Sequence, residues 1–385
     1  MSAVIAGLGL TDVGKVYGRR ASDFAAEAVR LAVTDAGLTL GDVDGLLVSS
    51  GKSGGPDLTL AEALGLSDLA LLEQVNAFGA TAGAMVAAAA HAVDSGQARH
   101  VVCVFADAPL RPGVRAAGAY KRRAANGYGG HLAASGITST TAYYALAAQR
   151  HMQTYGTTSE QLGAVAVAQR AWAADNPVAQ FREPLTLDEH QASRWIVDPL
   201  HLLDCCLVSN GGAAVLVTTA DRAAGLAQPP VHIWGWGQGH PGYSWERGSD
   251  FGQTTGAVQS GKAAMAMAGI APRDVTVRQI YDCYTYTVLV TLEDYGFCGK
   301  GEGGEVAASG ALGPGGALPT NTGGGQLSSY YLWGMTPLVE AVIQARGQGG
   351  ARQVENNDVV LVSGNGGILQ HHSTLVLSPN AKGGN

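Results

Sequence analysis

The chain has 385 residues, of which 46% are hydrophobic and only 14% charged, with 55 glycines and a formal net charge of −7. This length accommodates two core-sized domains, and the composition excludes a disordered or coiled-coil chain. The acidic balance argues against a nucleic-acid-binding protein, which would carry a basic stripe. No long uncharged apolar run and no basic N-terminal region stand out, so we expect neither a membrane span nor a signal peptide. We therefore expect a cytoplasmic protein.

Five cysteines occur, and their spacing does not pair them as metal ligands: Cys103, Cys205, Cys206, Cys283 and Cys298. Their odd number and the intracellular character of the chain predict reduced, mostly buried thiols. We therefore expect no metal site and no organic cofactor.

Short apolar strands alternate with alanine-rich helices, which predicts parallel β-α-β units and an α/β fold. Strands are predicted at 3–8, 45–50 and 101–105, and a long helix at about 80–95. An earlier helix is predicted to begin at its N-cap and to end just before a glycine, at Ser22 and Gly37 respectively. Its apolar face carries Phe24, Ala28, Leu31 and Ala32.

The chain repeats part of itself. Residues 34–43 recur as residues 266–275, each copy passing through an Ala-Gly turn to an Asp-Val pair, and 101–105 matches 359–363. These offsets of roughly 230–260 residues predict duplicated halves. Pro229 and Pro230 mark the boundary, giving halves of 1–228 and 229–385.

An irregular segment, 110–198, interrupts the first half and contains predicted helices at 140–155 and 159–174. We expect it to lie over one edge of the first half and, like many inserted loops, to carry binding function.

Four segments carry a family resemblance. Residues 75–83 read Val-Asn-Ala-Phe-Gly-Ala-Thr-Ala-Gly, 280–285 read Ile-Tyr-Asp-Cys-Tyr-Thr, and 327–334 read Leu-Ser-Ser-Tyr-Tyr-Leu-Trp-Gly. The run 198–214 contains Asp-Pro-Leu, a cysteine pair and Ser-Asn-Gly-Gly-Ala-Ala. Over essentially the whole chain these segments resemble the thiolase superfamily, nearest to the sterol-carrier-protein type. The resemblance implies a five-layered αβαβα arrangement and a homodimer formed through the edge strand of the first half.

The chain departs from that family at its reactive positions. Gly79 stands at the nucleophilic cysteine, Tyr281 at the histidine of His-Asp-Cys-Phe, and Tyr331 at the histidine of Gly-His-Pro-x-Gly. Gly364 and Gly366 occupy the second, Cys-x-Gly, motif. A thiolase-like pocket without these groups has no means of covalent Claisen exchange.

Glycines at both cysteine positions and tyrosines at both histidine positions make the chain resemble the thiolase-like aldolases of steroid side-chain catabolism. That resemblance implies retro-aldol cleavage of a β-hydroxyacyl-CoA to a ketone and a shorter acyl-CoA such as propionyl-CoA. It also implies a DUF35-type partner, an OB-fold domain commonly linked to a zinc ribbon, in an assembly of two of each subunit.

Such a cleavage needs a base for the β-hydroxyl proton and donors for the thioester oxygen. Tyr281 and Tyr331 are the predicted base and acid, with the assignment between them open, since phenols suit proton exchange with alcohols and enolates. The resemblance places backbone N–H donors at Gly79, Gly364 and Gly366. His372, after the last glycine turn, is the remaining predicted substrate-binding residue.

Each of these residues also has a purely structural interpretation. The alternative for Tyr281 and Tyr331 is a packed aromatic ring with a satisfied hydroxyl, and Tyr284 and Tyr330 are the neighbours that a one-residue error in register would place in the site. Glycines commonly serve turns alone. Asp282 orients a phenol or accepts a structural bond, and Cys283 is the candidate for another nucleophile. A basic cluster suits coenzyme A phosphates, a partner or solvent: Arg111, Arg115, Lys121, Arg122 and Arg123.

Two other functions remain open from the sequence. One is an acyltransferase or thiolase with a different nucleophile, and the other is a non-catalytic thiolase-like subunit of a complex.

Overall fold

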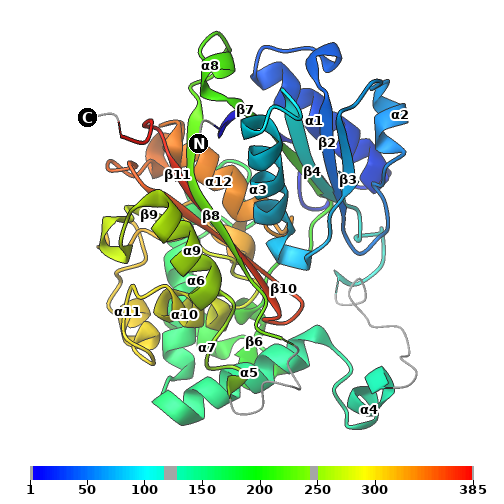
Figure 1. The fold of residues 1–385 in the computed structure, drawn as a ribbon. Helices are drawn as coiled ribbons and strands as arrows, with labels where there is room; N and C mark the ends of the chain where they lie inside the picture. The colour runs from blue at the N-terminus through cyan, green and yellow to red at the C-terminus, as the bar shows by residue number, and fades with distance from the viewer. Residues whose placement is uncertain (1–2, 117–127, 243–249, 384–385) are drawn as a thin grey trace.

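The computed structural model describes residues 3–116, 128–242 and 250–383 (Figure 1). In these residues a nine-stranded mixed sheet runs in the order β3-β2-β4-β7-β1-β8-β11-β10-β9. Its strands are β1 (Ala3–Leu10), β2 (Gly45–Ser50), β3 (Leu71–Gln74), β4 (Val101–Asp107), β7 (Gly211–Thr219), β8 (Val231–Gly239), β9 (Val277–Gln279), β10 (Val360–Gly366) and β11 (His371–Ser378). A separate two-stranded sheet pairs β5 (Trp195–Val197) with β6 (Leu200–His201).

The sheet consists of two halves with the same pairing pattern. In the first half β2 runs parallel to β4, β4 antiparallel to β7, and β7 antiparallel to β1. In the second half β9, β10, β11 and β8 repeat these three relationships in the same order. The halves join only where β1 meets β8, through the pairs Val4–His232 and Ile5–Val231. This symmetry confirms the predicted duplication.

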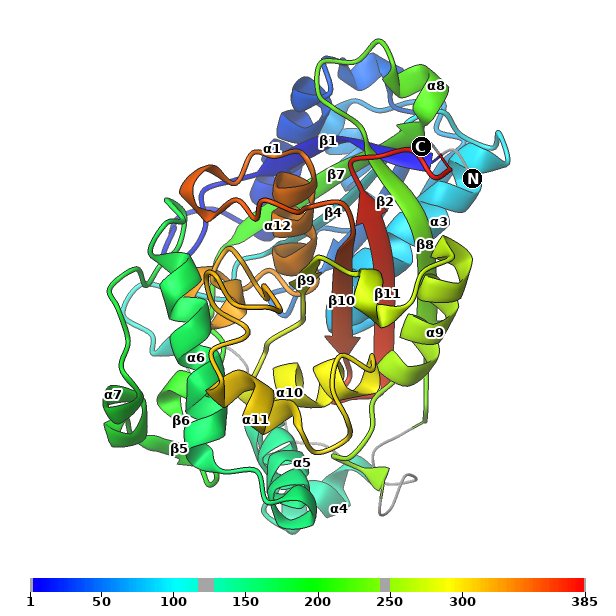
Figure 2. The same cartoon turned by 90° about the vertical axis from the view of Figure 1, so that its left-hand side faces the viewer.

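Helices cover both halves and separate them (Figures 1 and 2). Helix α1 (Ala21–Asp35) packs on the outer face of the first half, and α9 (Ala257–Ala268) on the outer face of the second. Helices α3 (Thr81–Asp94) and α12 (Met335–Ala345) contact strands of both halves, so they form the central layer. The predicted five-layered thiolase-like arrangement is therefore confirmed.

The central position of α3 explains its composition. Alanine, glycine, valine and methionine dominate the helix, and most of its residues are buried. A helix that is apolar all round belongs in a buried layer. Its small side chains bring the backbone close to strands on either side: a Cβ on Gly83 would lie 2.5 Å from Ser373 Oγ on β11.

The repeated turn has the same geometry in both halves. Gly37 and Gly269 follow α1 and α9 with φ of +76° each, a conformation that favours glycine. A short 3₁₀ turn follows in both copies, where the Asp42 carboxylate accepts the Thr39 N–H and the Asp274 carboxylate accepts the Ala271 N–H. The sequence repeat therefore reflects a repeated structural unit.

Two local predictions about α1 are wrong. The helix begins at Ala21 and its N-cap is Arg20, so Ser22 lies inside the first turn, where Asp23 accepts the Arg20 N–H instead. Leu31 is 39% exposed. Its Cβ lies beside Gly9 of β1 at the border of the buried face of the helix. The other predicted face residues are buried.

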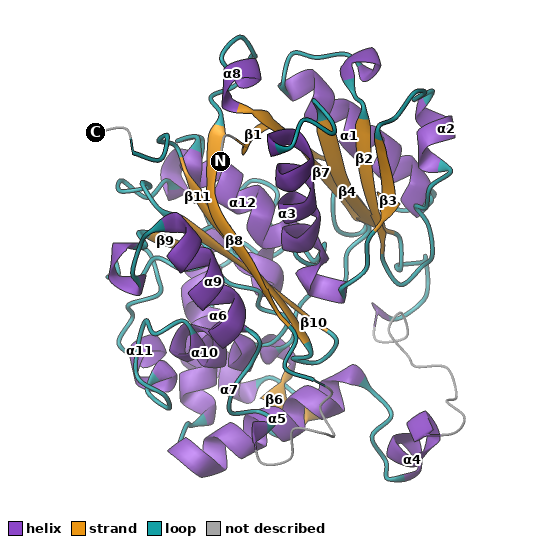
Figure 3. Ribbon diagram, in the orientation of Figure 1, coloured by secondary structure: helices purple, strands orange, loops and turns teal. Residues whose placement is uncertain are grey.

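The remaining helices gather mainly at one end of the molecule (Figure 3). They are α2 (Leu60–Leu64), α4 (Tyr128–Ala134), α5 (Thr140–Tyr155), α6 (Ser159–Ala173), α7 (Leu187–Ala192), α8 (Ala220–Ala223), α10 (Thr285–Asp294) and α11 (Gly303–Ala308). In the described residues, every helix is too short or too polar to cross a membrane.

The described part of the inserted segment packs mainly against the second half rather than over an edge of the first half, contrary to prediction. Its helix α6 packs against α10 and α11 of the second half. Polar contacts fix this position: His151 Nε2 lies 3.0 Å from the buried Glu293 carboxylate, and Trp172 Nε1 donates to Leu312 O at 2.9 Å. The insertion therefore contributes to the end of the second half that carries Tyr281.

Candidate functional site

The two predicted tyrosines meet in the structure. Tyr281 follows β9 and Tyr331 follows a single π-turn, Gly325–Ser329, yet their phenol oxygens lie 3.1 Å apart. Tyr281 is 3% exposed and Tyr331 is partly exposed. Residues 50 positions apart in the chain thus share one hydrogen bond between two groups that both donate and accept protons.

Asp282 connects the two tyrosine-bearing segments. Its buried carboxylate accepts the Gln326 N–H at 2.8 and 3.0 Å and the Leu327 N–H at 3.2 Å, both in the turn before Tyr331. Burial raises the pKa of Asp282 to about 7, although these N–H groups favour the charged form. The contacts support the structural alternative for this residue, in which it sets the distance between the segments.

The 198–214 run also braces this region. Cys206 N–H donates to Cys283 O and Leu207 N–H donates to Gln326 O, each at 3.0 Å. Ser209 Oγ then accepts the Tyr331 N–H at 3.0 Å. The motif therefore contacts both tyrosine segments through hydrogen bonds between residues far apart in the chain.

Gly79 lies directly against Tyr281. It sits in a 3₁₀ turn, Phe78–Ala80, that leads into α3. A Cβ placed on Gly79 would lie 2.3 Å from Tyr281 Cζ and 2.1 Å from Asn365 O, both far inside van der Waals contact. The Tyr281 ring thus occupies the space that a side chain at position 79 would need.

The glycines at the end of β10 approach the same turn. A Cβ on Gly364 would lie 2.7 Å from Gly79 O, and one on Gly366 would lie 2.9 Å from Gly79 N. Backbone therefore meets backbone at the start of α3, where early N–H groups have no intrahelical acceptor and the helix dipole favours negative charge. The structure brings Gly79, Gly364 and Gly366 together.

His372 is not brought to this site. Its Nε2 lies 3.1 Å from Tyr295 Oη and 3.0 Å from Ser363 Oγ, and its Cβ faces Gly256 at the start of α9. Burial lowers the pKa of His372 to about 3. Because successive strand residues face opposite sides, Ser373 faces α3 and His372 does not, so the geometry gives no support to its predicted substrate-binding role.

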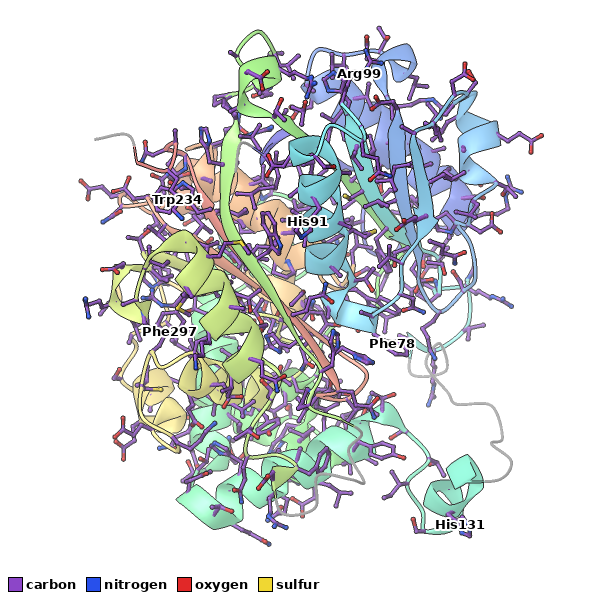
Figure 4. The ribbon with its side chains drawn as sticks, in the orientation of Figure 1. Phe78, His91, Arg99, His131, Trp234 and Phe297 are labelled. Carbon is purple, nitrogen blue, oxygen red and sulfur yellow. The ribbon has the colours of Figure 1, made fainter. Side chains whose placement is uncertain are left out.

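The other histidine of the pair, His371, lies on the site's side of β11. Its ring stacks on Phe78 with centroids 6.2 Å apart, and its Nδ1 lies 3.0 Å from His240 Nδ1. Phe78 has φ of +52°, is 43% exposed, and lies 6.0 Å from the Trp333 ring (Figure 4). Sequence reasoning missed Phe78 and Trp333. The available signal was their position, each within two residues of a motif glycine or tyrosine.

The thiols offer no ready nucleophile. All five cysteines are unpaired, two buried and three partly buried. Burial raises the pKa of Cys283 and of Cys298 to about 12, and raises the pKa of the other three thiols as well. Because the thiolate is the nucleophile, this environment disfavours a cysteine-based acyl-enzyme.

The remaining candidates have other surroundings. Tyr284 Oη donates to Thr141 Oγ1 at 2.9 Å and its ring packs on Tyr144, while Tyr330 is 3% exposed and burial raises its pKa. Arg111 and Arg115 are exposed. Lys121, Arg122 and Arg123 lie outside the described residues. Within the described ranges, no group of three or more His, Cys, Asp and Glu side chains is arranged to hold a metal ion.

Comparisons with known proteins agree with this fold. Residues 3–221 match the family model of the thiolase N-terminal domain, and residues 237–379 match a thiolase C-terminal domain-like model. A steroid side-chain-cleaving aldolase of Thermomonospora curvata is 39% identical over 375 residues, covering 95% of each chain. A 17-hydroxy-3-oxo-4-pregnene-20-carboxyl-CoA lyase of Mycobacterium tuberculosis is 38% identical over 376 residues, covering 95% of this chain and 97% of the relative.

A solved structure shows the same likeness. The Ltp2-ChsH2(DUF35) aldolase superposes with a TM-score of 0.87 at 38% identity, covering 98% of this chain and 97% of that one. The predicted relationship is confirmed: the chain belongs to the thiolase superfamily, and the two relatives matched over nearly their whole length are an aldolase and a CoA lyase.

Proposed function

We propose that the chain is a carbon–carbon lyase that cleaves a β-hydroxyacyl-CoA, a steroid side-chain thioester, by a retro-aldol reaction. The products are a ketone and a shorter acyl-CoA such as propionyl-CoA. The observation that carries the proposal is the Tyr281–Tyr331 phenol pair, 3.1 Å apart, beside a helix start where the thiolase nucleophile is replaced by glycine. The full-length aldolase relatives support the same reaction class.

In the proposed mechanism the two phenols carry the protons. One phenolate takes the proton of the β-hydroxyl group as the bond between the α- and β-carbons breaks and the ketone forms. The electron pair of that bond passes to the α-carbon, giving the enolate of the shorter thioester. The enolate then takes a proton at the α-carbon, so the cycle consumes and releases none overall. A hydrogen-bonded phenol pair suits this exchange because one phenol stabilises the charge of the other.

The glycine cluster supplies the second requirement. As the enolate forms, negative charge develops on the thioester oxygen, and backbone N–H groups held at a helix start stabilise such charge without reorganising. We assign this role to the amides of Gly79, Gly364 and Gly366. Because none of the three carries a side chain, their backbones approach one another closely enough for the amides to act together.

The assembly and boundaries are also part of the proposal. We infer a homodimer formed through β3, the edge strand of the first half, with a DUF35-type subunit on each copy, as the DUF35-containing aldolase complex suggests. Acyl-CoA as substrate, a cytoplasmic location and a division into 1–228 and 229–385 complete it.

The decisive experiment replaces each phenol singly. Tyr281→Phe and Tyr331→Phe keep the rings and remove only the hydroxyls, and each is expected to lower kcat about 10²–10⁴-fold, the usual range for general acid–base groups. The assay follows ketone and acyl-CoA products from a panel of β-hydroxyacyl-CoA thioesters, with and without a DUF35-type subunit. Tyr17→Phe, at a 44% exposed tyrosine, is the matched control.

Two outcomes would overturn the proposal. Unchanged turnover in both phenylalanine variants would remove the phenols from the mechanism. A mass increase of the chain during turnover would show an acyl-enzyme and favour an acyltransferase.

A further inference from the structure

A cavity of about 470 Å³ lies at the free edge of the second half, beside β9. It is lined by Pro272, Arg273, Val275, Thr276, Arg278, Gly296, Phe297, Gly316, Ala317, Leu318, Pro319, Val354 and Asn356. Neither Tyr281 nor Tyr331 is in this lining, so the cavity is separate from the proposed catalytic site. Its volume suits a small organic molecule.

Arg278 is an unusual member of this lining because it is only 3% exposed. Its Nη2 donates to Val275 O at 2.8 Å and its Nη1 to Thr276 O at 3.4 Å, and its guanidinium lies 4.5 Å from the centroid of the Phe297 ring. Its buried Nε–H has no hydrogen-bond partner, and no carboxylate in the described parts of the chain forms an ion pair with it.

A buried guanidinium without a counter-charge is costly, because backbone carbonyls and an aromatic face replace only part of its hydration. Burial disfavours the charged form of the guanidinium and lowers the pKa of Arg278 to about 10. Proteins keep such a cation where an anion joins it, as arginine commonly serves carboxylates and phosphates.

The charged residues that line the cavity also favour an anionic ligand. The chain has 31 acidic and 24 basic residues, yet the lining contains two arginines and neither aspartate nor glutamate. Arg273 is exposed and has Asp274 3.9 Å away, so it adds little net charge. The cavity therefore offers about one uncompensated positive charge, at its buried wall.

We propose that this cavity binds a small organic monoanion, a carboxylate on a compact apolar body. The carboxylate pairs with the Arg278 guanidinium at the cavity wall, and the body packs on Phe297, Val275 and Leu318. A single buried cation matches a singly charged carboxylate better than a doubly charged phosphate ester. The apolar residues of the wall require a body with little polar surface.

The test measures binding of benzoate to the full chain by isothermal titration calorimetry, with neutral benzamide and inorganic phosphate as comparison probes. We expect benzoate to bind and benzamide to bind at least about tenfold more weakly, since a hydrogen bond to a charged group is worth that factor or more. Tyr331→Phe should bind benzoate like the unmodified chain, which separates this cavity from the catalytic site.

Three variants locate the binding. Arg278→Gln should weaken benzoate about tenfold or more, and Arg278→Lys, which keeps the charge, should weaken it less. Because Arg278 is buried, Ala317→Trp is added: this exposed residue lines the cavity, so a large ring there should block it without touching the core. Equal binding of benzoate and benzamide, tighter binding of phosphate than of benzoate, or full benzoate affinity in Ala317→Trp would overturn the proposal.

Discussion

The contact between Gly79 and Tyr281 predicts that Gly79→Ala disables the protein. The added Cβ would lie 2.3 Å from Tyr281 Cζ and 2.1 Å from Asn365 O. Turning the tyrosine ring about its own axis leaves Cζ in place, so relief requires the whole side chain to shift, and Asn365 O belongs to the backbone of β10 and cannot swing aside. Overpacking of this kind costs about 1–3 kcal/mol, and we expect the upper part of that range.

The effect on turnover should be at least as large as the effect on stability. Any relief of the contact moves the Tyr281 phenol or the β10 glycines, and a misplacement of about 1 Å costs on the order of 10²-fold in rate. We therefore expect kcat to fall at least about 10²-fold, with a melting temperature about 2–8 °C lower. The assay combines product formation with thermal and urea unfolding.

Gly225→Ala is the matched control, because a Cβ at Gly225 meets no atom within 4 Å. It should change the unfolding free energy by less than about 0.5 kcal/mol. Tyr281→Ala removes one of the two contacts, so Gly79→Ala should cost less stability in a Tyr281→Ala background than in the unmodified chain, and activity should stay lost. If Gly79→Ala unfolds and turns over like Gly225→Ala, the steric argument is refuted.

Three further predictions concern the surroundings of the site. Asp282 keeps its proton to about pH 7 in the folded state and only to about pH 4 when unfolded. The native state therefore binds more protons between pH 4 and 7, so the free energy of unfolding should fall across that range relative to Asp282→Asn and then level off. Urea unfolding at a series of pH values would measure this. Cys283, whose pKa is about 12, should resist iodoacetamide in the native protein at pH 7.5, and Cys283→Ala should retain turnover; rapid labelling with loss of activity would contradict this. Co-expression with a DUF35-type subunit should raise solubility and activity and shift the elution volume in size-exclusion chromatography, whereas full activity as a lone homodimer would remove the partner from the proposal.

The sequence predicted the elements that repeat a strong local pattern. The strands at 45–50 and 101–105 and the helix at 140–155 begin where predicted, because apolar runs, caps and glycines act over a few residues. The meeting of Tyr281 with Tyr331 came from family resemblance rather than from spacing. No periodicity links two residues 50 positions apart on separate turns.

Two of the errors share a physical cause, which is that contacts distant in the sequence decide the structure, whereas the third is a choice between neighbouring capping residues. Ser22 is a good N-cap by type, but the Asp23 carboxylate accepts the Arg20 N–H and starts the helix earlier. His372 and His371 differ by one strand position, and only pairing with β10 decides which faces α3. The insertion's place beside α10 depends on buried partners such as Glu293, which no local pattern announces.

The replacements at positions 79 and 281 constrain one another. The ring of Tyr281 fits only because position 79 has no side chain, and a cysteine restored at 79 would meet that ring and Asn365 O at about 2 Å. Restoring the thiolase nucleophile therefore requires a smaller residue at 281 in the same step, and a phenol at 281 requires glycine at 79. By the family resemblance, glycine at 79 stands where thiolases carry the cysteine, and it leaves the space in which Tyr281 reaches Tyr331 at 3.1 Å. A non-catalytic subunit would have no need to keep both glycine at 79 and tyrosine at 281, whereas a proton-transferring lyase needs both residues.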